Sequence, residues 1–514
     1  MYKKLITSRL SLAATAVAIL SVTKVSAQIS LTGQLRPRAE VRDGFSNLTP
    51  NSTVPASFVS QRTRLIFGYK WDRLTFGATV QDVRVWGQDA STITPADGNR
   101  LMLHEGWADL VLANKADTTI KFKLFDNLSL KVGRQELIYD DARLIGNLDW
   151  LQQGRRFDMA LLKIGHHGWQ VDLGYAYNQN AEGASGTQYA PGNVPAYAKN
   201  SLGQLVPVPG GFIPLTVGGV ATGNSSKAGA PLLANPANSN GGNANYKSFA
   251  SVYIAKKLNQ TKVSFLFFKD NFSRYKLDSV GSIAAGYLYG RTYNPKETSD
   301  RYTFGAMISP VFGNASGFGK IAIQGAFYQQ LGEDRDDMDL NAYHGTISAT
   351  YSKGKFTVGP GFDVLSGNGP STKAGTTNRF DPLYGTPHKF WGYMDYFYAP
   401  SGSPVNGLKN YYFKTKFTTN SYSLAADLHR FDAYHTVSTG KKHLAHELDL
   451  IANYTLNKFT TIELGYCMMK ATRDLAAAKG QSLATVYDKS PSFGYLMINI
   501  RPDFFFSKPV AIKQ

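Results

Sequence analysis

Residues 29–42, ISLTGQLRPRAEVR, alternate between two kinds of side chain. One set is apolar (Ile29, Leu31, Leu35, Ala39 and Val41), and the other is polar or charged (Ser30, Thr32, Gln34, Arg36, Arg38, Glu40 and Arg42). Because successive side chains of a strand point to opposite faces, this pattern predicts a strand with one apolar and one charged face. Such a charged face is costly in a sandwich core but natural beside a water-filled lumen.

The same period-two alternation recurs along the chain. Arg62 and Arg64 alternate with Leu65 and Phe67, and further on charged residues alternate with apolar ones around Glu105, Asp109, Asp427 and His429. We count about eighteen such strands, and no apolar run is long enough to cross a membrane as a helix. The sequence therefore predicts an all-β fold, a transmembrane antiparallel β-barrel that forms a single unit over residues 28–514.

Residues 1–27 read as a signal peptide for export. They contain a basic start with Lys3, Lys4 and Arg9, then the apolar residues 10–22, and then a small-residue exit at residues 25–27. This order is that of a secretory signal, and the apolar part is too short for a transmembrane helix with these flanks. We expect cleavage before Gln28 and localisation in a bacterial outer membrane.

The net charge favours an anionic partner. The chain has 55 Lys and Arg against 37 Asp and Glu, for a formal charge of +18. An exported chain seldom meets nucleic acid, so an anionic solute, outer-membrane lipid or lipopolysaccharide fits better. Cys467 is the single cysteine and cannot form an internal disulfide, so we interpret it as a small wall residue.

Short and long connections alternate, as they do at the two faces of a membrane barrel. Tight turns are predicted at residues 70–72, 165–168, 258–260, 353–354 and 419–420, and long loops at 87–100, 140–152, 180–244, 272–298, 367–408 and 472–490. The Gly- and Asn-rich stretch 180–244 is expected to be an extracellular loop. Counting 388–398 as a wall strand makes the total odd, so we predict that this segment lies within loop 367–408, as a constriction or a short helix. An ordinary wall strand with a miscount elsewhere is the alternative.

The densest charged stretch is residues 131–158, KVGRQELIYDDARLIGNLDWLQQGRRFD. Mixed rows of arginines and carboxylates in a lumen set a transverse field that attracts and orients anions. The alternative is a structural ion-pair network that holds strands and loop together.

Two blocks carry a resemblance to a known family. Residues 133–158 (GRQELIYDDARLIGNLDWLQQGRRFD) and 380–398 (FDPLYGTPHKFWGYMDYFY) resemble the alginate export family of outer-membrane proteins. The resemblance implies an eighteen-stranded barrel with an arginine-lined constriction that conducts an anionic polysaccharide outward. It also implies that the arginines of the first block, Arg134, Arg143, Arg155 and Arg156, lie in the pore or its loop.

The candidate pore-lining and substrate-binding residues combine these four with residues chosen from alternation or from the charged stretch. The full set is Arg36, Arg38, Glu40, Arg62, Arg64, Arg84, Glu105, Asp109, Arg134, Glu136, Asp141, Arg143, Arg155, Arg156 and Asp158.

Three classes of function remain open on these grounds. The first is a conduit for an acidic polysaccharide or uronate-type oligosaccharide, with periplasmic export proteins as possible partners. The second is a general or substrate-specific porin for small anionic nutrients. The third, a barrel enzyme, is disfavoured because none of the nine histidines sits in a recognisable nucleophile motif.

No metal site or cofactor is expected. The acidic run 333–339 lacks the glycine and glutamate spacing of a calcium loop, so we interpret it as a loop tip that is solvated or bridged to lipopolysaccharide by divalent ions.

Overall fold

The wall of the molecule is a closed ring of antiparallel strands. The computed structural model describes residues 27–87, 101–117, 119, 120, 122, 124–178, 181–183, 186–188, 192–210, 212–217, 220, 221, 230–232, 235, 236, 246–314, 316–397 and 404–507. The signal peptide predicted over residues 1–27 falls, except for Ala27, outside the described residues.

Eighteen wall strands follow one another in chain order within the described residues. They are β1 (Gln28–Asp43), β2 (Ala56–Trp71), β3 (Leu74–Val85), β4 (Leu101–Asn114), β5 (Asn127–Gln135), β6 (Phe157–His166), β7 (Trp169–Tyr177), β17 (Ser248–Leu258), β18 (Thr261–Ser282), β19 (Gly286–Ser309), β21 (Gly319–Glu333), β22 (Asp339–Lys353), β23 (Phe356–Leu365), β25 (Leu408–Thr418), β26 (Tyr422–Asp432), β27 (His443–Asn457), β28 (Thr460–Ala471) and β29 (Ser492–Ile500). Each pairs with the next, and β29 pairs back onto β1, so the barrel predicted from alternation is confirmed.

The remaining elements lie in the connections or at the ends of the wall. These are β8 (Ala181–Gly183), β9 (Gly186–Gln188), β10 (Gly192–Asn193), β11 (Tyr197–Lys199), β12 (Leu205–Pro207), β13 (Phe212–Val217), β14 (Val220–Ala221), β15 (Ala230–Pro231), β16 (Asn235–Pro236), β20 (Val311–Asn314), β24 (Thr376–Thr377), the 3-10 turn η3 (Pro387–Lys389), α2 (Arg473–Ala478) and β30 (Asp503–Phe506). No helix in the described part of the chain is long and apolar enough to span a membrane.

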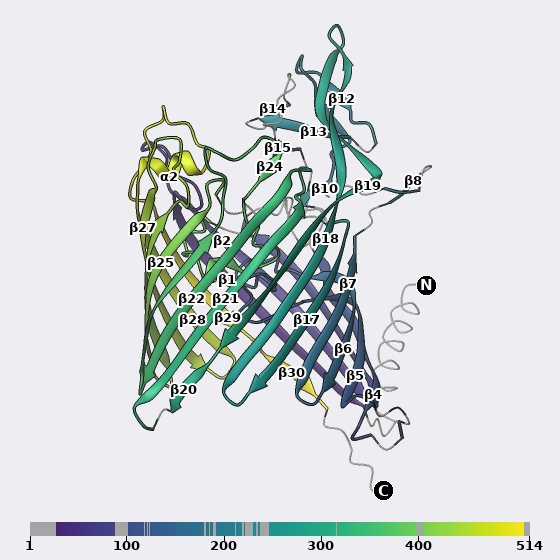
Figure 1. Cartoon of the computed structure of the whole chain (residues 1–514), viewed down its shortest axis with the longest axis vertical. Helices are drawn as coiled ribbons and strands as arrows, with labels where there is room; N and C mark the ends of the chain where they lie inside the picture. Colours follow the sequence, from purple (N-terminus) through teal and green to yellow (C-terminus); the bar gives the residue numbers. More distant parts are fainter. Residues whose placement is uncertain are drawn as a thin grey trace, which may run out of the picture.

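The strands are tilted around a cylinder, with α2 and β12–β14 at one end and β20 and β30 at the other (Figure 1). All five predicted tight turns are present, and they join β2 to β3, β6 to β7, β17 to β18, β22 to β23 and β25 to β26. Because successive wall strands run in opposite directions, these five turns all lie at the same end of the barrel, which we call the short-turn end. The opposite end is the long-loop end. In membrane barrels the short turns face the periplasm.

The two faces of the wall differ as the alternation predicts. On β1, Leu35 and Val41 are 36% and 52% exposed, whereas Arg36 and Arg38 between them are 3% and 2% exposed. Arg62 lies directly opposite Arg36 in the ladder and is completely buried. Apolar side chains therefore face outward and charged ones face the interior.

One predicted loop is wrong. Residues 272–298 are largely the ends of β18 and β19, which stay paired out to Ser282 and Gly286 and form a long hairpin with β13 paired against it. The arms of this hairpin are mainly polar, and Leu288 packs with Ala198 and Phe212 of the preceding connection in a small buried cluster. The arms carry no alternating row of lipid-facing apolar residues, since strands outside a membrane need none. Alternation therefore could not reveal them.

The segment 388–398 is not a wall strand. β23 pairs directly with β25, and Leu365 lies opposite Leu408, so the ring closes without it. Residues 388–397 contain the end of η3 and several buried aromatic side chains. Tyr398 lies outside the described residues, as do 88–100 of the predicted loop 87–100 and much of 180–244.

Adjacent alanines on β26 provide a test of the two-faced wall. Ala426 faces outward opposite Leu450, whereas Ala425 faces inward opposite Lys416. We predict that Ala426→Arg lowers the free energy of unfolding by roughly 2–4 kcal/mol, because the charge enters the lipid-facing band. Ala425→Arg should cost clearly less, because its neighbour Lys416 is already exposed to the lumen. Urea unfolding in phospholipid vesicles measures both, and equal costs would contradict the assigned faces.

Candidate functional site

Two long connections fold into the barrel instead of projecting from it. The first, residues 136–156 between β5 and β6, reaches both sides of the wall. Its Asp140 accepts hydrogen bonds from Tyr253 on β17 (2.7 Å) and Ser264 on β18 (2.9 Å). Its Asp149 is bound by Arg62 on β2 (2.7 Å). The β5–β6 loop therefore crosses the lumen.

The second connection, residues 366–407 between β23 and β25, also crosses. Tyr384 donates a hydrogen bond to Asp270 on β18 (2.9 Å), and the Met394 amide donates to Glu447 on β27 (2.8 Å). Gly392 adopts a φ of +83° and lies so close to Glu447 that a Cβ would sit 2.5 Å from its carboxylate. Any side chain at this position would push the loop from the wall.

The two loops are joined to each other along their backbones. Tyr384 donates to the carbonyl of Leu144 (2.9 Å) and accepts from the amide of Gly146 (3.0 Å), which makes a short parallel bridge. The rings of Trp150 and His388 stack with centroids 3.9 Å apart. We call this joined unit the loop pair. Its buried side chains, which include Phe380, Tyr384, Trp391, Met394 and Phe397, form an apolar cluster with inward residues of the wall.

Arg36 and Arg62 hold a carboxylate of the β5–β6 loop between them. Asp149 lies 3.2 Å from Nη1 of Arg36 and 2.7 Å from Nη2 of Arg62. The two arginine side chains are 4% and 0% exposed, but that of Asp149 is 42% exposed. Partial burial acts to raise the pKa of Asp149, but the charges of Arg62 and Arg36 outweigh it and lower the pKa to about 2.

Arg38 and Glu40 extend this arginine row along β1. Arg38 donates to Glu40 (2.8 Å) and to the backbone oxygen of Trp150 (2.8 Å), and its guanidinium lies 4.1 Å from the Trp150 ring centroid. Glu40 also accepts from Ser60 and Arg42. Arg38 therefore anchors the loop, and Glu40 holds the Arg38 side chain in place.

Arg64 and Glu136 form the next contact. Arg64 donates to Gln81 (2.6 Å) and lies 3.7 Å from Glu136. Glu136 is also bonded to His104 (2.9 Å) and Asn147 (2.8 Å). Burial alone would raise the pKa of Glu136, but these two hydrogen bonds keep it below its ordinary value.

On the opposite side of the lumen, Arg143 is the principal contact of the β5–β6 loop. It is bound to Asp363 on β23 (2.7 Å) and to Asp141 (3.3 Å). Arg155, at the base of the β5–β6 loop, donates to the carbonyl of Gly385 (2.8 Å), which adds another link between the two loops.

The other predicted inward residues lie on the β3–β6 wall and at the base of the loop. Glu105 accepts from Thr79 and from the amide of Glu136, and Asp109 pairs with Lys163 (2.7 Å). Arg156 lies at the base of the β5–β6 loop, where it donates to the Gln153 carbonyl (3.5 Å).

Three predicted pore residues face outward, and these predictions are wrong: they are Arg84, Arg134 and Asp158. Arg84 lies opposite Gln61, one residue out of phase with the inward Arg62, and pairs with Asp82 (2.7 Å). Arg134 lies opposite Asp158, and the two form an ion pair (2.8 Å) on the outer face. The inward residues of β5 and β6 at this level are Gln135 and Phe157, so a shift of one residue reverses the face.

Several inward charges were not singled out from the sequence. Arg301 on β19 binds Asp270 (3.1 Å) and Asp381 of the second loop (2.8 Å), and Glu447 holds Met394 as described above. The alternation of the strands does indicate the wall residues among them. Each lies on the inward side of its strand, directly opposite a buried residue of the adjacent strand. Their loop partners are distant in sequence and give no such signal.

Between the loop pair and the short-turn end, the inner wall carries lysines and fewer acids. By register, Lys131, Lys163, Lys257, Lys262, Lys320, Lys414 and Lys416 point inward with Asp109, Asp172, Asp427 and Glu463. Lys131 lies 3.8 Å from the ring centroid of Trp107, which also faces inward opposite Gly77. Among the described residues, no group of three or more His, Cys, Asp or Glu is arranged to hold a metal ion.

The arginine–Asp149 contact gives a pH test. The pKa of the Asp149 carboxyl is lowered from its ordinary value of 3.8 to about 2 in the barrel. The contact therefore stabilises the loop fully above about pH 4. This contribution, about 1 kcal/mol after allowance for solvent around a half-exposed carboxylate, is lost as the pH falls from about 4 to 2. A spin label at exposed Gln153 should gain mobility over this range, and Asp149→Asn should remove the transition. An unchanged transition in Asp149→Asn would contradict the assignment.

The comparisons with known proteins agree with the barrel. The model of the alginate export family matches residues 27–177. No curated protein matches the sequence. Solved structures with a similar fold include OccAB4 of Acinetobacter baumannii (TM-score 0.54, 11% identity, covering 93% of this chain and 98% of that chain). OccK5 (OpdH) and OpdQ of Pseudomonas aeruginosa each give a TM-score of 0.51 at 11% and 12% identity, again over 93% of this chain and 98% of theirs.

At these identities the likeness to solved structures concerns the fold alone. The family match covers β1 to β7 and includes the first of the two blocks that carried the resemblance. The match over residues 27–177 and the closed eighteen-stranded barrel together fit an outer-membrane β-barrel similar to the alginate export family.

Proposed function

We propose that this barrel is a channel and that it conducts an acidic polysaccharide, or its uronate-type oligosaccharides, outward through a basic inner surface. Uronate residues carry one carboxylate per sugar, so a chain of them is recognised by spaced cations and by flat surfaces for the sugar rings. Periplasmic export proteins are the partners such a route implies.

The observation that carries this proposal is the carboxylate held between Arg36 and Arg62. Asp149 makes charge-assisted contacts with both guanidinium groups while remaining half exposed to the lumen. This geometry already binds a carboxylate, and a uronate carboxylate has the same chemistry. We interpret Asp149 as an internal stand-in that substrate displaces when the β5–β6 loop moves.

The lysines on the short-turn side of the loop pair support the same reading. They lower the electrostatic barrier for an anion that enters from that end, while Asp109 and Asp427, paired with Lys163 and Lys414, keep binding weak enough for release. The inward Trp107 beneath Lys131 offers a surface on which a sugar ring can stack.

A polymer requires that the loop pair move. The apolar cluster of the loop pair packs against the wall, and its polar contacts reach β1, β2, β17, β18 and β27. In this account the loop pair is the gate, and its ion pairs with inward arginines hold it closed.

The first test is block of single-channel current in a planar bilayer. We predict that oligomannuronate added on the short-turn side blocks the current at lower concentration than the monomer does. Arg36→Gln/Arg62→Gln should weaken the block about thirtyfold, since each of the two lost charge-assisted contacts is worth about 1 kcal/mol. Arg134→Gln is the matched control, because that arginine faces outward, and its block should be unchanged.

Two results of this measurement would count against the proposal. Block by the monomer at the same concentration as the oligomer would favour a porin for small organic anions. Equal block of the double variant and the wild type would remove Arg36 and Arg62 from the substrate path.

A second test locks the loop pair. Thr386 donates its amide hydrogen to the carbonyl of Ala142 (2.9 Å), so Ala142→Cys/Thr386→Cys should form a disulfide between the loops. The native Cys467 is completely buried and should not interfere. We predict that the oxidised variant loses oligouronate flux into liposomes and that a reductant restores it, with both single-cysteine variants as controls. Undiminished flux through the oxidised variant would show that the loop pair is no gate.

A further inference from the structure

The outer face of β25–β28 carries a regular apolar surface. Direct cross-strand partners form three apolar rows: Phe413, Leu428, Leu448 and Met468; then Thr415, Ala426, Leu450 and Tyr466; then Phe417, Leu424, Ala452 and Leu464. Most of these large side chains are exposed, for example Leu428 at 53% and Leu464 at 56%. Successive rows are roughly 7 Å apart along the strands, which suits the length of acyl chains.

The next row toward the long-loop end is basic. It consists of Tyr411, Arg430, His446 and Lys470, again direct partners on neighbouring strands. Lys409 lies one row further, and Lys489 of the following loop borders the same surface. The outer face is therefore uncharged in the row of Phe413, Leu428, Leu448 and Met468 and positively charged in the row that follows it.

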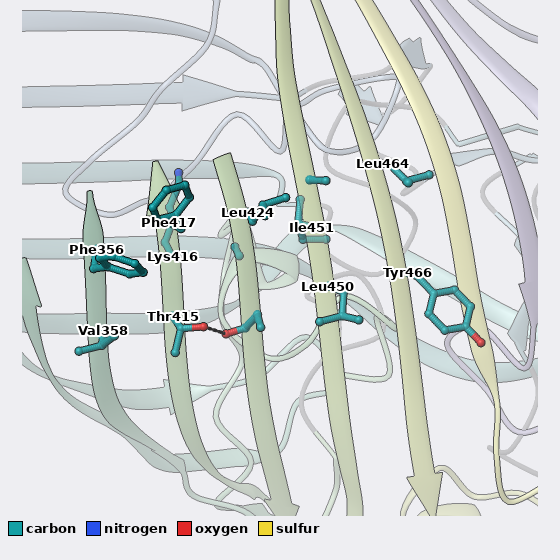
Figure 2. A pocket seen from close by; sticks show the side chains of 13 residues that line it. Phe356, Val358, Thr415, Lys416, Phe417, Leu424, Leu450, Ile451, Leu464 and Tyr466 are labelled. Atoms are coloured by element: carbon teal, nitrogen blue, oxygen red, sulfur yellow. Dashed lines mark hydrogen bonds between the residues drawn. The ribbon is translucent and has the colours of Figure 1, made fainter. Parts of the chain in front are cut away.

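The surface is hollowed along both parts. A depression of about 1060 Å³ is lined by Leu428, Arg430, His446, Met468, Lys470 and Lys489. A second one of about 560 Å³ continues it toward the short-turn end, and Tyr466 lines both. Figure 2 shows the side chains of this lower depression, Phe356, Phe417, Leu424, Leu450, Leu464 and Tyr466, side by side across the strands.

The charge at this place is unbalanced in a way that differs from the other side of the barrel. Near β2–β6 the outward arginines have acidic partners in Asp82 and Asp158. At the basic row, Asp432 is the carboxylate that contacts Arg430 (3.1 Å), and it is shared with His443 (2.8 Å). Lys470 and Lys489 are both exposed.

We infer that the outer face of β25–β28 is a docking site for a phosphorylated, multiply acylated glycolipid, the lipid A part of lipopolysaccharide. Its acyl chains lie in the apolar rows, and its phosphates meet Arg430, Lys470 and Lys489. These cations spread over strands that are each about 5 Å apart, which suits a headgroup with two phosphates on a disaccharide better than the single phosphate of a phospholipid. The basic row lies at the long-loop end, the side where the outer leaflet meets the barrel.

The test is lipid binding to the full-length protein in detergent, followed by native mass spectrometry. The probes are hexa-acylated bisphosphorylated lipid A and, for comparison, monophosphorylated lipid A and phosphatidylglycerol. EDTA is present so that bridging divalent ions do not contribute. We expect the wild type to bind the bisphosphorylated form most tightly, and Arg430→Gln/Lys470→Gln to weaken it roughly 25-fold, about fivefold per charge removed.

Arg134→Gln is the control, because it removes an outward arginine that is already neutralised by Asp158. It should bind lipid A as the wild type does. The inference is overturned if the double variant, shown by heat-modifiable migration to be folded, keeps wild-type affinity, or if phosphatidylglycerol binds the wild type as tightly as lipid A. Neither result bears on conduction, so the proposed channel function stands or falls separately.

Discussion

The closed ladder of backbone hydrogen bonds is the constraint on which the rest of this structure depends. No water is available in the hydrocarbon region, so each strand must satisfy its amides and carbonyls against a neighbour, and the last strand must return to the first. The pairing of β29 with β1 achieves this. Once the ring is closed, alternation divides every strand into a lipid-facing and an enclosed side, and on β1 and β2 the arginines lie on the enclosed side.

The enclosed charges then determine how the lumen is filled. Arginines on β1, β2 and β19 are held by carboxylates from loops, at Asp149 and Asp381, and Arg143 of the β5–β6 loop is held by a carboxylate of the wall. Removing one partner from such a pair leaves an uncompensated charge inside the barrel. The loops are therefore held by paired charges that solvent and substrate can compete for, in addition to their apolar cluster. This combination suits a unit that is closed at rest and able to move.

Much of the wall follows from sequence, because the inward and outward sets of β1 and β2 differ so clearly in polarity. The predictions fail at the ends of strands: Arg134 lies beside the inward Gln135, and one residue of phase moved it to the outer face. The arrangement of the loop pair was beyond sequence reasoning, since Gly146 and Tyr384 meet across a long separation in the chain. Yet the two blocks that carried the family resemblance, residues 133–158 and 380–398, contain the two segments that join inside the barrel.

The central claim is that the water-filled path through the interior of this barrel is lined by a surplus of positive charge. The most direct measurement is the reversal potential of single channels in a planar bilayer under a tenfold potassium chloride gradient. A surplus of inward arginine and lysine predicts a potential whose sign shows preference for chloride. A potential of the opposite sign, showing preference for potassium, would contradict the account.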